Sequence, residues 1–157
     1  MSGFVTPGSP NLADYTLFLQ NSVQIPTTAL PVDSPWISYA FNQGMAMTQY
    51  VAPVSSIEYV LAVYNCAAHI QIVITPDQPG QTYFQQMRGA QAQGGFGLSS
   101  MPIGFLSSAS DNGTAQSMVV PDSLRNLTIG DLQFLQTPWG RFWLSYCQDF
   151  GSVWGLS

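Results

Sequence analysis

Apolar residues recur at helical spacing along much of the chain. Between Ser34 and Thr48 they fall at i, i+3, i+4, i+7, i+8 and i+11, which predicts one face of an amphipathic helix. Ser34 and Pro35 supply an N-cap and a proline at the first helical position. The small residues Ala40 and Gly44 lie on this face, so we expect a neighbouring helix to approach closely there.

The strongest pattern predicts a central helix over about 56–73. Ser55 and Glu58 form a capping box at its start, and Pro76 lies beyond its end. A helix that is apolar around this much of its circumference is surrounded by neighbours on most sides. The positions of its apolar stripe are Ile57, Val60, Leu61, Val63, Tyr64, Ala67, Ala68, Ile70 and Ile72.

Two further helices are predicted near the ends of the chain. Ser9 and Pro10 resemble an N-cap and a first helical residue, and Thr137-Pro138 repeats that signal. The first helix would carry Leu12, Tyr15, Phe18 and Leu19 on one face, and the last Trp139, Phe142, Trp143, Tyr146 and Cys147. Residues 1–9 are expected to form an N-terminal arm, and residues 150–157 an apolar tail that docks on another surface.

Residues 75–120 have a different character and are predicted to be an inserted loop. Tyr83 to Arg88 is expected to form a short helical turn, and Asn112-Gly113 between apolar runs indicates a β-hairpin around 103–120. The predicted fold is therefore mainly α. It is one domain over 1–157, a small helical bundle around the helix at about 56–73, with an inserted β-hairpin or extended arm (about 94–120) and a docking C-terminal tail.

The composition narrows the class of protein. The chain has no lysine, and only 7% of its residues are charged while 46% are hydrophobic. Soluble domains carry about 25% charged residues. The most apolar stretch, 57–74, is interrupted by polar residues that include Glu58, so it does not suit a membrane span. No basic residue precedes an apolar core near Met1, so no secretory signal is expected. We expect a soluble, assembled protein whose surface is polar but uncharged and is in large part buried against other subunits.

Charge and cysteine content exclude further classes. The net charge is −5 and the only basic residues are Arg88, Arg125 and Arg141, so sequence-independent capture of nucleic acid is not expected. Arg141 is expected to pair with a carboxylate in a structural role, rather than to stack on aromatic rings. Cys66 and Cys147 fall within apolar helical patterns, so they are interpreted as buried thiols outside any disulfide.

No catalytic constellation emerges from the sequence. His69 is the single histidine, so the usual zinc sites are excluded, and it is expected at a helix surface or a subunit contact. Cys66 lies three residues before it on the same helix, which is a poor geometry for a nucleophile and its base. The Asp and Glu residues are scattered along the sequence. Several fall at helix caps or turns, where a carboxylate accepts hydrogen bonds from backbone amides. The glycines at 94–97 lack a partner lysine, so a phosphate cradle is not expected. The chain is predicted to be no enzyme and to need no cofactor or metal.

Three segments together resemble the head–tail adaptor (connector) proteins of tailed bacteriophages. They are Ile25–Leu30 with Ser34–Phe41, Tyr59–His69 with its Ala-Ala-His ending, and Leu132–Arg141 with its Thr-Pro-Trp-Gly helix start. The resemblance covers about half of the chain and contains no catalytic motif. The long segment over 75–120 departs from the pattern, because members of this family are often shorter there.

The resemblance implies a structural virion protein of the neck region, synthesised in the host cytoplasm. It implies a homo-oligomer, a dodecamer ring below the portal protein, that extends the DNA channel and offers a platform for a tail or nozzle protein. Genomic DNA would pass without specific binding, and no membrane is involved. The other readings that stay open are a different neck or tail component, such as a tail terminator or decoration protein, a carbohydrate-binding module, and an enzyme acting through Cys66 and His69.

Subunit and portal contacts are predicted on two segments that are apolar without helical periodicity. These are residues 94–120 and the C-terminal tail. The predicted interface residues are Phe96, Met101, Ile103, Phe105, Leu106, Met118, Val153, Trp154 and Leu156.

Overall fold

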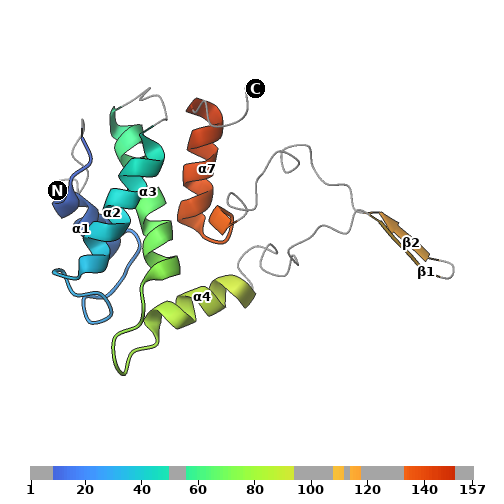
Figure 1. The fold of residues 1–157 in the computed structure, drawn as a ribbon, viewed down its shortest axis with the longest axis horizontal. Helices are drawn as coiled ribbons and strands as arrows, with labels where there is room; N and C mark the ends of the chain where they lie inside the picture. The colour runs from blue at the N-terminus through green and yellow to red at the C-terminus, as the bar shows by residue number, and fades with distance from the viewer. Residues whose placement is uncertain (1–8, 50–55, 94–107, 112–113, 118–132, 151–157) are drawn as a thin grey trace.

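The computed structural model describes residues 9–49, 56–93, 108–111, 114–117 and 133–150 (Figure 1). The fold is mainly helical, which confirms the predicted class. The elements are α1 (Leu12–Asn21), α2 (Pro35–Thr48), α3 (Ser56–Ile74), α4 (Tyr83–Gln93), β1 (Ser108–Asp111), β2 (Thr114–Ser117) and α7 (Pro138–Phe150).

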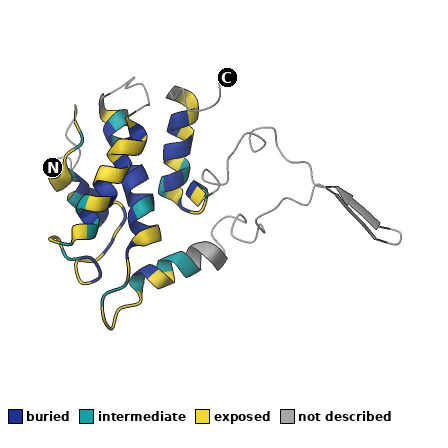
Figure 2. Cartoon of the chain, in the orientation of Figure 1, coloured by how far each residue is buried: buried dark blue, intermediate teal, exposed yellow. Residues whose placement is uncertain are grey.

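Helix α3 is the centre of the bundle, as its apolar pattern predicts. Every residue from 62 to 69 is buried, and α3 contacts α1, α2, α4 and α7 (Figure 2). Figure 1 shows α1 and α2 on one side of α3 and α7 on the other. The helix ends at Ile74, one residue beyond the predicted end. The capping box at Ser55 lies outside the described residues.

Helices α2 and α3 meet at a glycine. A methyl group on Gly44 would lie 2.8 Å from the Cβ of Ala67 and 2.9 Å from the carbonyl oxygen of Val63. Such distances are shorter than van der Waals contact, so only a glycine lets the two backbones lie this close. The prediction that small residues of this face admit a neighbouring helix is confirmed.

Helix α1 begins two residues later than predicted. Its N-cap is Asn11, whose side-chain oxygen accepts a hydrogen bond from the amide of Ala13 at 2.8 Å. The hydroxyl of Tyr64 on α3 accepts from the Asn11 amide at 3.0 Å and donates to its carbonyl at 3.1 Å. The Ser9-Pro10 signal was therefore wrong, because Asn11 is held both by its own cap and by Tyr64. Leu12, predicted on the core face, is 40% exposed.

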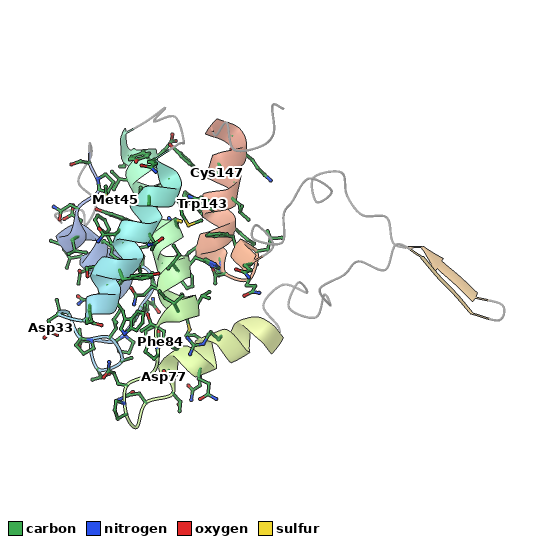
Figure 3. All side chains as sticks on the ribbon, viewed as in Figure 1. Asp33, Met45, Asp77, Phe84, Trp143 and Cys147 are labelled. Carbon is green, nitrogen blue, oxygen red and sulfur yellow. The ribbon has the colours of Figure 1, made fainter. Side chains whose placement is uncertain are left out.

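Helix α4 is longer than the predicted turn and is held at a charged corner. The carboxylate of Asp77 accepts from the amides of Phe84 at 2.6 Å and Gln85 at 2.9 Å, which satisfies the first turn of α4. The guanidinium of Arg88 donates at 2.9 Å to the carbonyls of Ile72 and Thr75 at the end of α3, and lies 3.8 Å from Asp77. Figure 3 shows Asp77 and Phe84 together at this corner.

The strands β1 and β2 pair antiparallel on either side of Asn112-Gly113. Ser108 lies opposite Ser117, and Asp111 lies opposite Thr114. The larger hairpin or arm predicted over 94–120 stays a prediction, because residues 94–107 and 118–132 lie outside the described part of the chain. Residues 1–8 of the predicted arm over 1–9 and residues 151–157 of the predicted tail over 150–157 also lie outside it.

One helix of the described residues is long and apolar enough to cross a membrane. The window is Ile57–Ile74, and 61% of it is buried inside the folded chain. A single such helix is weak support for a span, because the core helix of a soluble protein has the same length and composition.

Candidate functional site

The joint between α3 and α7 contains the one histidine of the chain. His69 is only 4% exposed, and its Nδ1 lies 2.8 Å from the hydroxyl oxygen of Thr137. Its ring packs on Phe134 with 4.4 Å between the ring centroids. The expectation of a histidine at a helix surface was wrong, because α7 and the residues before it cover this part of α3.

Thr137 is the N-cap of α7 and connects the helix to α3. Its hydroxyl oxygen accepts a hydrogen bond from the amide of Gly140 at 2.9 Å, as a capping side chain does. The hydroxyl proton is then available to the Nδ1 of His69, which fits a neutral imidazole. Because Thr137 is fully buried, this hydrogen bond joins the two helices away from water.

Gly140 gives α7 its close approach to this joint. A methyl group there would lie 2.9 Å from the His69 Nδ1 and 2.9 Å from the carbonyl carbon of Phe134. Any side chain at residue 140 would therefore push α7 away from α3. The short hydrogen bond between Thr137 and His69 depends on this absence of a side chain.

A second hydrogen bond joins α2 to α7 inside the bundle. The Thr48 hydroxyl donates to the Gly44 carbonyl at 2.7 Å and accepts from the indole nitrogen of Trp143 at 3.1 Å. Cys66 is hydrogen-bonded to the same threonine, and it belongs to the same buried cluster as Trp143 and Cys147. In Figure 3, Trp143 and Cys147 lie on α7 beside α3. Both cysteines are buried and outside any disulfide, as predicted.

The protonation of Cys66 and His69 does not suit a nucleophile and its base. Burial raises the pKa of the Cys66 thiol far above its usual value, which keeps the sulfur protonated. Burial lowers the pKa of His69 to about 4, and the Nδ1 of this residue is directed to Thr137. The pair therefore lacks both an accessible thiolate and a base directed at the sulfur.

The two arginines of the described residues bind backbone carbonyls. Arg88 holds the end of α3, and Arg141 donates to the carbonyl of Leu135 at 3.2 Å. This bond gives Arg141 a structural role with a backbone carbonyl, whereas the sequence predicts pairing with a carboxylate. These cations act at helix ends, so they do not form the basic surface patch that captures nucleic acid.

The nine predicted interface residues all lie outside the described part of the chain. They belong to 94–107, 118–132 and 151–157. The structure does bring together the three segments that carry the adaptor resemblance. Phe41 of the first packs on Tyr64 of the second, and His69 at the end of the second lies against Thr137 and Gly140 of the third.

Sequence reasoning missed the roles of Thr48, Gly140 and Thr137. Thr48 falls on the apolar face of its helix, and a hydroxyl at a core position is the signal of a buried hydrogen bond. Gly140 lies in the first turn of a helix, where the backbone does not require a glycine, and this is the signal of a close approach. Thr137 was recognised as a helix start but not as a partner of His69. No group of three or more metal-ligating side chains occurs within the described ranges.

Comparison with known proteins gave no relative of this chain. No protein-family model matches it, no curated protein is similar to it in sequence, and no solved structure matches its fold.

Proposed function

We propose that the chain is a structural virion protein, a head-to-tail adaptor that forms a ring below the portal. In this role it extends the DNA channel and provides a platform for a tail or nozzle protein. The observation that carries the proposal is the joint between His69, Thr137 and Gly140. Two motifs of the resemblance that are distant in sequence contact each other here, and together they fasten α7 to α3.

The second support is the way the few charges are used. Arg88 and Asp77 hold the corner between α3 and α4, and Arg141 binds the carbonyl of Leu135. A chain with a net charge of −5 repels the phosphates of a duplex. An acidic ring suits a conduit through which genomic DNA passes without specific binding. Strong retention of DNA that falls with added salt would contradict this part of the proposal.

The third support is the amount of apolar surface in a chain so poor in charge. Val32 is 59% exposed, Tyr39 49% and Phe142 46%. Burial of such side chains by neighbouring subunits would explain how the chain dispenses with lysine. This proposal also assigns subunit and portal contacts to residues 94–120 and to the C-terminal tail.

The test is native mass spectrometry or mass photometry of the purified protein, alone and mixed with virion cores. A ring of twelve copies, or a monomer that assembles only on a portal, supports the adaptor. A ring of six copies would assign the protein to the tail, as a terminator or another neck component. A monomer that never associates would contradict the proposal. The carbohydrate-binding module and the enzyme would then be the remaining hypotheses. The first of them expects a mainly β fold, whereas this fold is mainly helical.

A further inference from the structure

The solvent-facing side of α2 carries no charge. Its exposed residues on one side form what we call the α2 face: Tyr39, Asn42, Gln43, Ala46 and Met47. Tyr39 is 49% exposed and Met47 is 37% exposed. The run from residue 34 to residue 57, which contains all of α2, is the longest stretch of the sequence without Asp, Glu, Lys or Arg.

This composition is typical of an interface and unusual for a solvated helix. The centre of a protein–protein interface is enriched in aromatic residues and methionine and depleted of charged residues. An amphipathic helix at a free surface normally carries charge on its outer side. Trp36, partly buried beside this face, packs edge-on against Tyr39 with 6.1 Å between the ring centroids. The α2 face therefore offers a firm aromatic contact.

A second face of similar character lies on α7. Pro138, Phe142 and Ser145 are exposed and fall in one row along the helix, which we call the α7 face. Phe142 is 46% exposed. The row itself is uncharged until it reaches Asp149 near the end of the helix, and the partly exposed Arg141 beside it donates its guanidinium to the carbonyl of Leu135. Figure 1 shows α2 and α7 on different sides of α3, so the two faces are carried by different helices of the bundle.

We propose that the α2 face of one copy packs against the α7 face of the next copy. The inference rests on the proposed ring and names the surfaces that build it. Each copy carries a net charge of −5, so two copies repel each other unless they meet where charge is absent. The α2 face and the Pro138–Ser145 stretch of the α7 row carry no charged residue, and each supplies an exposed aromatic ring. A contact between two different faces is heterologous, so it repeats from copy to copy and closes into a ring when the rotation fits.

The test introduces one carboxylate into each face. Gln43→Glu changes the α2 face and Ser145→Glu the α7 face, while Gln85→Glu makes the same exchange as Gln43→Glu at an exposed position of α4. Subunit association is measured by mass photometry over a range of concentrations, alone and on virion cores. We expect the first two variants to weaken association by about tenfold or more, because an unpaired carboxylate is costly to bury. Gln85→Glu should associate as the wild type does. Circular dichroism checks that all three fold.

Mixing the two interface variants makes the test specific to these surfaces. A Gln43→Glu copy keeps an intact α7 face, and a Ser145→Glu copy keeps an intact α2 face. A mixture should therefore form a capped dimer of twice the 17.0 kDa subunit mass, which neither variant forms alone. Variants that assemble as the wild type does would overturn the inference and leave the proposed ring in place. A mixture without the dimer would also overturn it. A wild type that never associates, alone or on virion cores, would overturn both proposals.

Discussion

Replacing Gly140 by alanine should loosen α7 from the centre of the bundle. The added methyl group would lie 2.9 Å from the Nδ1 of His69 and 2.9 Å from the carbonyl carbon of Phe134. The Phe134 contact involves backbone, which cannot turn aside as the end of a flexible side chain can. Helix α7 must therefore shift, and its shift lengthens the 2.8 Å hydrogen bond between Thr137 and His69.

The size of this effect follows from three contributions. Overpacking of a tight site costs about 1–3 kcal/mol, and a weakened cap and hydrogen bond at Thr137 costs about 1 kcal/mol more. Alanine favours the helix more than glycine does, and this offsets the loss of stability by up to about 1 kcal/mol. We expect Gly140→Ala to lower the free energy of unfolding by about 2 kcal/mol, and the melting temperature by about 4–8 °C.

Gly89→Ala provides the matched control for Gly140→Ala. Gly89 lies within α4, and a methyl group there meets nothing within 4 Å. This substitution should raise the free energy of unfolding by about 0.5–1 kcal/mol, because alanine restricts the unfolded chain and favours the helix. Urea titrations followed by circular dichroism measure both variants. A Gly140→Ala protein as stable as the wild type, or more stable, would refute the reasoning about the joint.

Three further perturbations test the interior of the bundle. Tyr64→Phe should lower the free energy of unfolding by about 1 kcal/mol, because it removes two hydrogen bonds to the cap of α1. Tyr15→Phe should be neutral or stabilising, because the buried hydroxyl of Tyr15 has no hydrogen-bond partner within the described ranges; equal losses from the two variants would contradict this. Burial lowers the pKa of His69 to about 4, below the 6.5 of the unfolded chain, so the unfolded state binds the proton first as the pH falls. Stability should fall by an amount on the order of 3 kcal/mol between pH 6.5 and pH 4, and urea titrations of a His69→Gln variant should lack that contribution. Cys66 and Cys147 should resist iodoacetamide in the native protein and react fully in guanidinium, as counted by mass spectrometry; rapid native alkylation would show that the cluster opens.

The helical core could be predicted because its signals are local and periodic. The apolar stripe of α3 and the proline at the start of α2 depend on residues within one element. Both predictions were confirmed except at Ile57, which is predicted on the core face and is 43% exposed. The start of α1 was predicted wrongly because a distant residue decides it. Asn11 gains two hydrogen bonds from Tyr64, and no pattern around Ser9 and Pro10 can report such a contact.

The candidate site was the harder part to predict, for the same physical reason. The burial of His69 depends on α7, which follows it by about seventy residues, so the periodicity of α3 could not place it. Cys66 and His69 are three residues apart on one helix, so their spacing alone allows a nucleophile next to its base. In the structure each has its own threonine partner, Thr48 and Thr137, on a different helix.

Helix α4 is attached to the bundle mainly at its corner with α3, so we expect it to detach more easily than the other helices. Within the described residues, α4 contributes a single fully buried large side chain, Phe84. The rest of its attachment consists of the partly buried Tyr83 and Met87, and of Arg88 and Asp77, which bind exposed or half-buried backbone groups. Hydrogen exchange should therefore show that the amides of α4 exchange as one cooperative unit, at a lower opening free energy than the amides of α3. Salt screens the ion pair between Arg88 and Asp77, so the ionic strength of the solvent sets how firmly residues 83–93 stay attached while the bundle itself remains folded.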